Sequence, residues 1–240
     1  MAFGSDRRYM SQAQADSALI DVGLRQYMLR VYNYMAAGLA LTGVVAFLVA
    51  SSPEALHMIF QTPLKWVILL APVGLAFFMG ARIDSMSVGT AQAVFWAYAA
   101  LIGVMLSSYL VIYTGTSVAR VFFITAAAFG GLSLYGYTTK KDLSGFGSFL
   151  IMGVWGLMIA GLVNIFLQSV MLHFVMSAIG VLVFAGLTAY DTQKIKELYW
   201  EGDGADIAAK KSIMGALTLY MDFINLFIFL MQFLGDRRSE

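Results

Sequence analysis

The chain has 240 residues, of which 60% are hydrophobic and only 12% are charged, and its formal net charge is +1. Soluble domains carry about 25% charged residues, so 15 basic and 14 acidic side chains could not cover the surface of so apolar a folded chain. The composition also excludes a disordered chain, and the near-neutral charge excludes a nucleic-acid-binding protein. The absence of cysteine excludes disulfides, thiolate metal sites and cysteine nucleophiles. What remains is a polytopic membrane protein.

The positions of the charges predict seven membrane-spanning helices. A helix needs about 20 mostly apolar residues to cross about 30 Å of hydrocarbon. The longest uncharged interval, residues 143–190, must fold back on itself, and its polar break near Gln168 predicts a tight turn there. Continuous apolar runs favour helices over strands, whose residues would alternate. The predicted spans are residues 31–50, 64–83, 88–113, 121–137, 146–167, 170–190 and 213–234.

The basic residues predict the orientation of these spans. The N-terminal segment and the loops after the second, fourth and sixth spans hold 11 Lys and Arg, and the opposite side holds 4. Basic residues favour the cytoplasmic side, so the N-terminus is expected inside and the C-terminal tail outside. Residues 1–29 contain no signal-peptide core. The predicted organisation is a polar cytoplasmic segment (1–29), a single membrane domain (30–234) and a short tail (235–240).

Asp222 is the main candidate for a functional residue, because it lies near the middle of the last span. A charge inside the hydrocarbon is costly and must be neutralised, paired or hydrated. Thr218, Asn225 and Gln232 recur at helical spacing on the same face as Asp222, which predicts a polar stripe that faces away from lipid. The alternative is a buried acid that serves packing alone.

Asp191 and Arg82 are the next candidates. Asp191 ends the sixth span, beside Thr188, and an acid at such a position can be a plain interfacial residue. If the two helices meet at a turn centred on Asp203, the two carboxylates are offset along the helix axes by about 10 Å. Arg82 closes the second span on the same side, where it could hold one acid ionised or simply anchor the helix. Lys65, Arg120 and His173 are interpreted as interfacial anchors.

Two segments of the chain resemble the signature segments of the Bax inhibitor-1 family, also called transmembrane Bax inhibitor motif proteins. These are GLTAYDTQKI at residues 186–195 and LYMDFINLF at residues 219–227. RVYNYM at residues 30–35 and MGARI at residues 79–83 are similar to the bacterial, YccA-like branch. The resemblance covers residues 20–234.

The resemblance implies a function. Members of this family have seven helices with the last at the centre of the bundle. Asp191 and Asp222 would form a pH-sensitive pair in a calcium leak pathway, and Arg82 would latch to one of them. No resident cofactor is implied. Ca²⁺ would be the transported ion, and protons would bind to the pH-sensitive pair. The expected location is the bacterial inner membrane.

The chemistry of the residues is compatible with this expectation. Two close carboxylates in a medium of low dielectric share a proton and titrate as a pair. Ca²⁺ prefers six to eight oxygen ligands, and Asp191, Asp222, Asn225, Thr188 and Thr218 could supply only some of them. The sequence thus predicts a weak, transient Ca²⁺ site.

Two alternatives remain open. Two aspartates on consecutive spans are also found in intramembrane aspartyl proteases, which use both acids and one water. However, Asp222 stands in a Tyr-Met-Asp-Phe sequence, without the glycines that let a substrate backbone approach. Bacterial relatives further suggest a regulatory partner of a membrane-anchored AAA protease, which would use the polar N-terminal segment as its contact. The two histidines, His57 and His173, lie in no hydrolase motif.

Overall fold

The computed structural model describes residues 12–238, with side chains from Val22 onward. In this part of the chain, helices account for nearly every residue, and the one β-type pairing is an isolated bridge between Tyr113 and Arg237. The helices are α1 (Gln12–Ala50), α2 (Pro53–Phe60), α3 (Leu64–Arg82), the 3-10 helix η1 (Ile83–Ser85), α4 (Val88–Ile112), α5 (Gly115–Thr138), α6 (Ser144–Leu167), α7 (Val170–Glu197) and α8 (Ala205–Leu234).

Seven of the described helices are long and apolar enough to cross a membrane, which confirms the predicted all-α, seven-span fold. The tight turn between the fifth and sixth spans is also confirmed, because Gln168 ends α6 in the left-handed conformation, with φ 49°. The short helix α2 was not predicted. It begins after Ser52, whose hydroxyl accepts a hydrogen bond from the backbone N–H of Ala55, and Pro53 occupies its first turn.

Helices α1, α7 and α8 extend well beyond the apolar runs that predicted them. Helix α1 continues without a break across residue 30, the expected boundary between the polar segment and the membrane domain. Helix α7 continues to Glu197 and α8 begins at Ala205, and residues 198–204 form the linker between them. Both helices therefore extend past their predicted apolar spans at the end where the linker joins them. Residues 1–11, which include the first part of the predicted N-terminal segment, lie outside the described residues.

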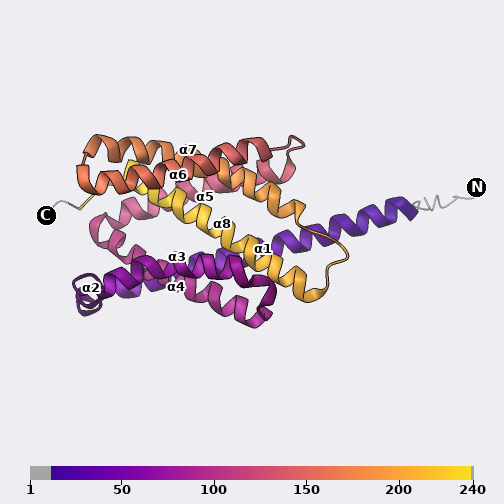
Figure 1. Cartoon of the computed structure of the whole chain (residues 1–240), viewed down its shortest axis with the longest axis horizontal. Coiled ribbons are helices and arrows are strands. Elements are labelled where there is room, and N and C mark those ends of the chain that lie inside the picture. Colours follow the sequence, from indigo (N-terminus) through magenta and orange to yellow (C-terminus); the bar gives the residue numbers. More distant parts are fainter. Residues whose placement is uncertain (1–11, 239–240) are drawn as a thin grey trace, which may run out of the picture.

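Helix α8 lies at the centre of the bundle. In its most apolar stretch 67% of the residues are buried, against 39% or less in every other span. It packs against α7, α1, α5 and α4. In Figure 1 it runs diagonally, in yellow, between one group formed by α1, α3 and α4 and another formed by α5, α6 and α7.

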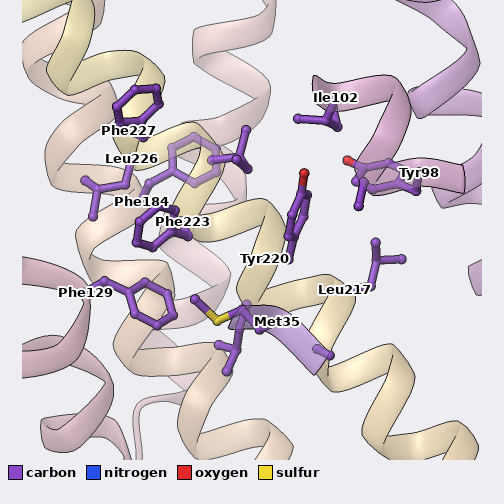
Figure 2. Packing of buried hydrophobic residues seen from close by; sticks show 14 of the residues in the cluster. Met35, Tyr98, Ile102, Phe129, Phe184, Leu217, Tyr220, Phe223, Leu226 and Phe227 are labelled. Atoms are coloured by element: carbon purple, nitrogen blue, oxygen red, sulfur yellow. The ribbon is translucent and has the colours of Figure 1, made fainter. Parts of the chain in front are cut away.

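The buried face of α8 holds aromatic side chains that reach both groups of helices. Figure 2 shows Tyr220 extending toward Tyr98 of α4, whereas Phe223 lies on the side of Phe129 and Phe184. The Tyr220 and Thr42 hydroxyls are hydrogen-bonded at 2.6 Å, and Thr42 donates at 2.8 Å to the carbonyl oxygen of Ala99. This contact joins α1, α4 and α8, and it satisfies polar groups that water could not reach.

Helices α3 and α6 form the periphery. Only 11% and 6% of the residues in their apolar stretches are buried. Large apolar side chains such as Phe77 and Phe166 are 74% and 87% exposed. Exposed apolar surface of this extent on long apolar helices is what a lipid environment requires.

The C-terminal segment is fixed to the turn between α4 and α5. The N–H of Thr114 donates to the carbonyl of Asp236, and the N–H of Arg238 donates to that of Ile112, both at 3.0 Å. Arg120 also forms an exposed ion pair with Asp236 at 2.8 Å. Figure 1 places this segment and the start of α1 at opposite ends of the bundle, as an odd number of spans requires.

Candidate functional site

The two predicted aspartates come together between α7 and α8, with their carboxyl groups close enough to share a proton. Asp222 is only 4% exposed, and Asp191 is half-buried. A hydrogen bond between two carboxyl groups requires a proton on one of them, because two carboxylates are both acceptors. A pair that shares one proton in this way carries one negative charge.

The linker between α7 and α8 explains why the expected axial offset is absent. The sequence count placed both helix ends at one tight turn, but α7 ends six residues after Asp191 and α8 begins seventeen residues before Asp222. The seven linker residues can span about 23 Å when extended. Helix α8 can therefore begin well beyond the end of α7, and this shift brings the two carboxyl groups level.

The Oδ2 atom of Asp222 is buried, and no donor in the described part of the chain reaches it. A buried carboxylate oxygen without a partner is energetically costly. A proton shared with Asp191, or a cation that enters the pair, would satisfy it. The arrangement is thus suited to binding one positive charge.

The supporting polar residues bond mainly to their own helices. Thr188 donates to the Phe184 carbonyl at 2.8 Å, Thr218 to that of Met214 at 3.1 Å, and the amide of Asn225 to that of Met221 at 2.9 Å. Each of these side-chain oxygens can still accept a hydrogen bond or a cation. These three residues lie on the same two helices as the carboxyl pair.

A chain of hydroxyl groups beside the pair was not predicted. The Tyr32 hydroxyl is hydrogen-bonded to that of Ser133 at 2.6 Å, and Ser133 to that of Thr192 at 3.0 Å. Thr192 in turn donates to the carbonyl of Thr188 at 2.7 Å. The chain joins α1, α5 and α7 next to Asp191. The available signal was a hydroxyl residue within, or just beyond, three of the predicted apolar spans.

Arg82 does not join the pair, contrary to the expected latch. Its side chain is exposed at the end of α3, a helix that packs on α4 and α2 rather than on α7. Among the residues that the structure describes, the ion pairs are Arg120–Asp236 and Lys211–Asp203, and neither includes Arg82. The physical reason is that the end of α3 meets α8 near Lys210, which donates to the carbonyl of Asp84. Lys210 precedes Asp222 on α8 by twelve residues, or about 18 Å.

Metal-binding capacity is small. No group of three or more His, Asp or Glu side chains gathers within the described residues. A divalent cation at the pair would meet two carboxyl groups and would take its remaining ligands from amide, hydroxyl or carbonyl oxygens and water. These residues fit a transient contact with a cation better than a storage site.

The fold and the site define a class: a seven-helix integral membrane protein whose central last helix holds one of two neighbouring aspartates. The family model described as inhibitor of apoptosis-promoting Bax1 matches residues 24–239. The chain belongs to this Bax inhibitor-1 family, as the two signature segments predicted.

Bacterial relatives align over nearly the whole chain. An uncharacterised protein of Rickettsia prowazekii is 54% identical over 219 residues, which cover 91% of this chain and 93% of the relative. An uncharacterised protein of Caulobacter vibrioides is 47% identical and covers 98% of both chains. The inner membrane protein YbhL of Escherichia coli K12 is 45% identical, over 90% of this chain and 94% of YbhL.

Proposed function

We propose that the protein is a pH-sensitive leak pathway for Ca²⁺, controlled by the Asp191–Asp222 pair. The observation that carries the proposal is the close approach of these two acids, one of which is 4% exposed at the centre of the bundle. Ionisable groups at this depth belong mostly to ion and proton pathways.

The pair would respond to pH in both directions. A second proton removes its remaining charge, whereas loss of the shared proton leaves two close like charges that repel each other. Either change alters the force between α7 and α8 and the attraction for a cation. Because α8 contacts four other spans, a small shift at the pair would reach the whole bundle.

A binding and transport role fits the pair better than peptide hydrolysis. An aspartyl protease must present both acids and a water molecule to a substrate backbone. Asp222 is buried among large side chains, and its neighbours Tyr220 and Phe223 are 0% and 3% exposed. The name of the relative YbhL supports the bacterial inner membrane as the location, with the N-terminus in the cytoplasm.

The test of this function is calcium flux into proteoliposomes with the Asp222→Asn variant. Asparagine keeps the shape of the side chain but cannot titrate, so flux should lose its dependence on pH between about pH 6 and 8. Asp206→Asn is the matched control, because Asp206 is an exposed acid on the same helix. Its pH profile should equal that of the wild type. An unchanged profile in Asp222→Asn would leave Asp222 with a packing role only.

A second candidate role is regulation of a membrane-anchored AAA protease. In Figure 1 the first turns of α1 extend beyond the rest of the bundle, where a partner could reach them. Deletion of residues 1–20 separates the two roles. Loss of protease binding with intact ion flux would favour the regulatory role for this segment, and retained binding would exclude it.

A further inference from the structure

Three pairs of different chemistry lie along the seam between α7 and α8. Asp191 faces Asp222, Phe184 stacks on Phe229 with ring centroids 5.7 Å apart, and Ser177 donates to the side chain of Gln232 at 3.1 Å. In each pair a residue from α7 meets one from α8, in antiparallel order. The acid layer and the aromatic layer are separated by seven residues on both helices, or about 10 Å.

The aromatic layer is closely packed because α7 carries a glycine opposite it. A Cβ atom on Gly180 would overlap the ring of Phe229. The absent side chain lets the Phe229 ring lie against the backbone of α7. The Phe184 ring is 8% exposed and lies nearly parallel to that of Phe229, at 25°. Neither side chain carries a polar group, so the stack offers no hydrogen bond to water at this level of the seam.

Beyond the aromatic layer lies a pocket of about 360 Å³ between α6, α7 and α8. Its polar lining consists of Asn164, His173 and Gln232, and Phe229 lines it as well. Gln232 is held in place by Ser177 and donates to the hydroxyl of Tyr109 at 3.3 Å. The pocket lies near the α6–α7 turn, at the opposite end of α7 from Asp191.

We propose that this pocket is the outer vestibule of the pathway, which takes water and hydrated cations, and that the Phe184–Phe229 stack is the barrier between the vestibule and the acid pair. Hydrophobic constrictions close a pathway by excluding water. The identity of the ion as Ca²⁺ rests on the proposed function. The barrier concerns only the access of water and is independent of that function.

The absence of native cysteine allows this barrier to be tested by thiol labelling. Asn225 lies on the face of α8 between Asp222 and Phe229, and His173 lines the vestibule. Single Asn225→Cys and His173→Cys variants are labelled with a membrane-impermeant cationic methanethiosulfonate. The reagent is applied to the side of the membrane from which His173→Cys reacts.

We expect His173→Cys to react readily and Asn225→Cys to react slowly. Adding Phe229→Ala should speed the labelling of Asn225→Cys by about tenfold, because the hydrophobic barrier is removed. Phe233→Ala is the matched control, since Phe233 is 40% exposed on the same helix and pairs with Phe174 at the end of the seam, beyond the Ser177–Gln232 layer and away from the proposed barrier. It should leave the rate unchanged. Phe229→Leu, which keeps an apolar side chain, gives an intermediate rate and guards against a folding defect in the alanine variant.

Two results would overturn the barrier: equal labelling of Asn225→Cys and His173→Cys in the wild-type background, or labelling of Asn225→Cys that neither Phe229 variant accelerates. Calcium flux separates this inference from the proposed function. Phe229→Ala should raise basal flux and retain its pH dependence, because the acid pair is intact. Absence of calcium flux from every variant, with the labelling pattern as expected, would refute the leak function and leave the barrier standing.

Discussion

At the scale of single residues, the polar groups inside the bundle differ in what the fold does with them. Asp191 and Asp222 are brought together, whereas Arg82 is left exposed at the end of α3. Both acids and the arginine stood out in the sequence for the same reason, a charge next to or inside an apolar run. Their different outcomes depend on which helices are neighbours.

Arg82 gives the prediction at this scale. Since its guanidinium contacts neither acid, Arg82→Ala should leave calcium flux per purified molecule and its pH profile unchanged, and so should Arg82→Lys. The loss of a basic residue beside a span can still lower insertion or expression. Proteoliposome flux normalised to protein distinguishes these effects, with Lys140→Ala, an exposed loop residue on the same side, as the control. A higher basal flux of Arg82→Ala at about pH 8 would show that the latch forms in another conformation.

At the scale of elements, close helix crossings depend on small residues. Helices α5 and α7 meet at Gly136, where a Cβ atom would overlap the carbonyl oxygen of Ala189. Small residues at such crossings let transmembrane backbones approach and pack. The crossing lies two residues from Asp191, so it also sets the position of the acid pair.

Gly136→Ala should therefore destabilise the protein. The new methyl group would clash with backbone atoms of Ala189, which cannot rotate away as a side chain can. Such overpacking lowers the free energy of unfolding by about 1–3 kcal/mol. Gly130→Ala on the same helix is the control, because no atom lies within 4 Å of its Cβ position. That change should be neutral or stabilising, by up to about 1 kcal/mol, since alanine is the better helix former. Thermal unfolding in one detergent measures both, and equal melting temperatures would contradict the close crossing.

At the scale of the whole molecule, the number of spans and the position of the termini form one consistent pattern. Seven spans place the two ends of the described chain at opposite ends of the bundle. The C-terminal segment carries Arg237 and Arg238, which would favour the cytoplasm by charge alone. Its backbone hydrogen bonds to the α4–α5 turn, together with the contact of Arg238 Nε with the Tyr113 carbonyl at 3.1 Å, hold it at the other end.

The orientation can be tested with reporter fusions. Fusions after Gly115 and Gln168 should report an external location, because 11 of the 15 basic residues lie on the opposite side. A fusion after Thr139, in the loop between α5 and α6, serves as the internal control. A cytoplasmic signal from either of the first two fusions would contradict the predicted orientation.

The sequence by itself determined the environment, the number of spans and the candidate acids. Runs of apolar residues about 20 long are required by the thickness of the bilayer, and a charge within such a run stands out because hydrocarbon penalises it. These are local properties of the chain. The two signature segments added the family, and with it the central position of α8.

Only the tertiary structure decided which polar groups meet. The length of α7 and the extended linker determine the position of Asp191 relative to Asp222 along the helix axes. Counting residues from an assumed tight turn could predict neither the helix length nor the linker. The separation of Arg82 from the pair depends on where the end of α3 meets α8, which is near Lys210 and not near Asp222. The hydroxyl chain from Tyr32 and the Phe184–Phe229 stack likewise join residues far apart in sequence. Helix neighbours are chosen by packing between surfaces, and an apolar run carries little information about its partners because lipid and protein interiors are equally apolar.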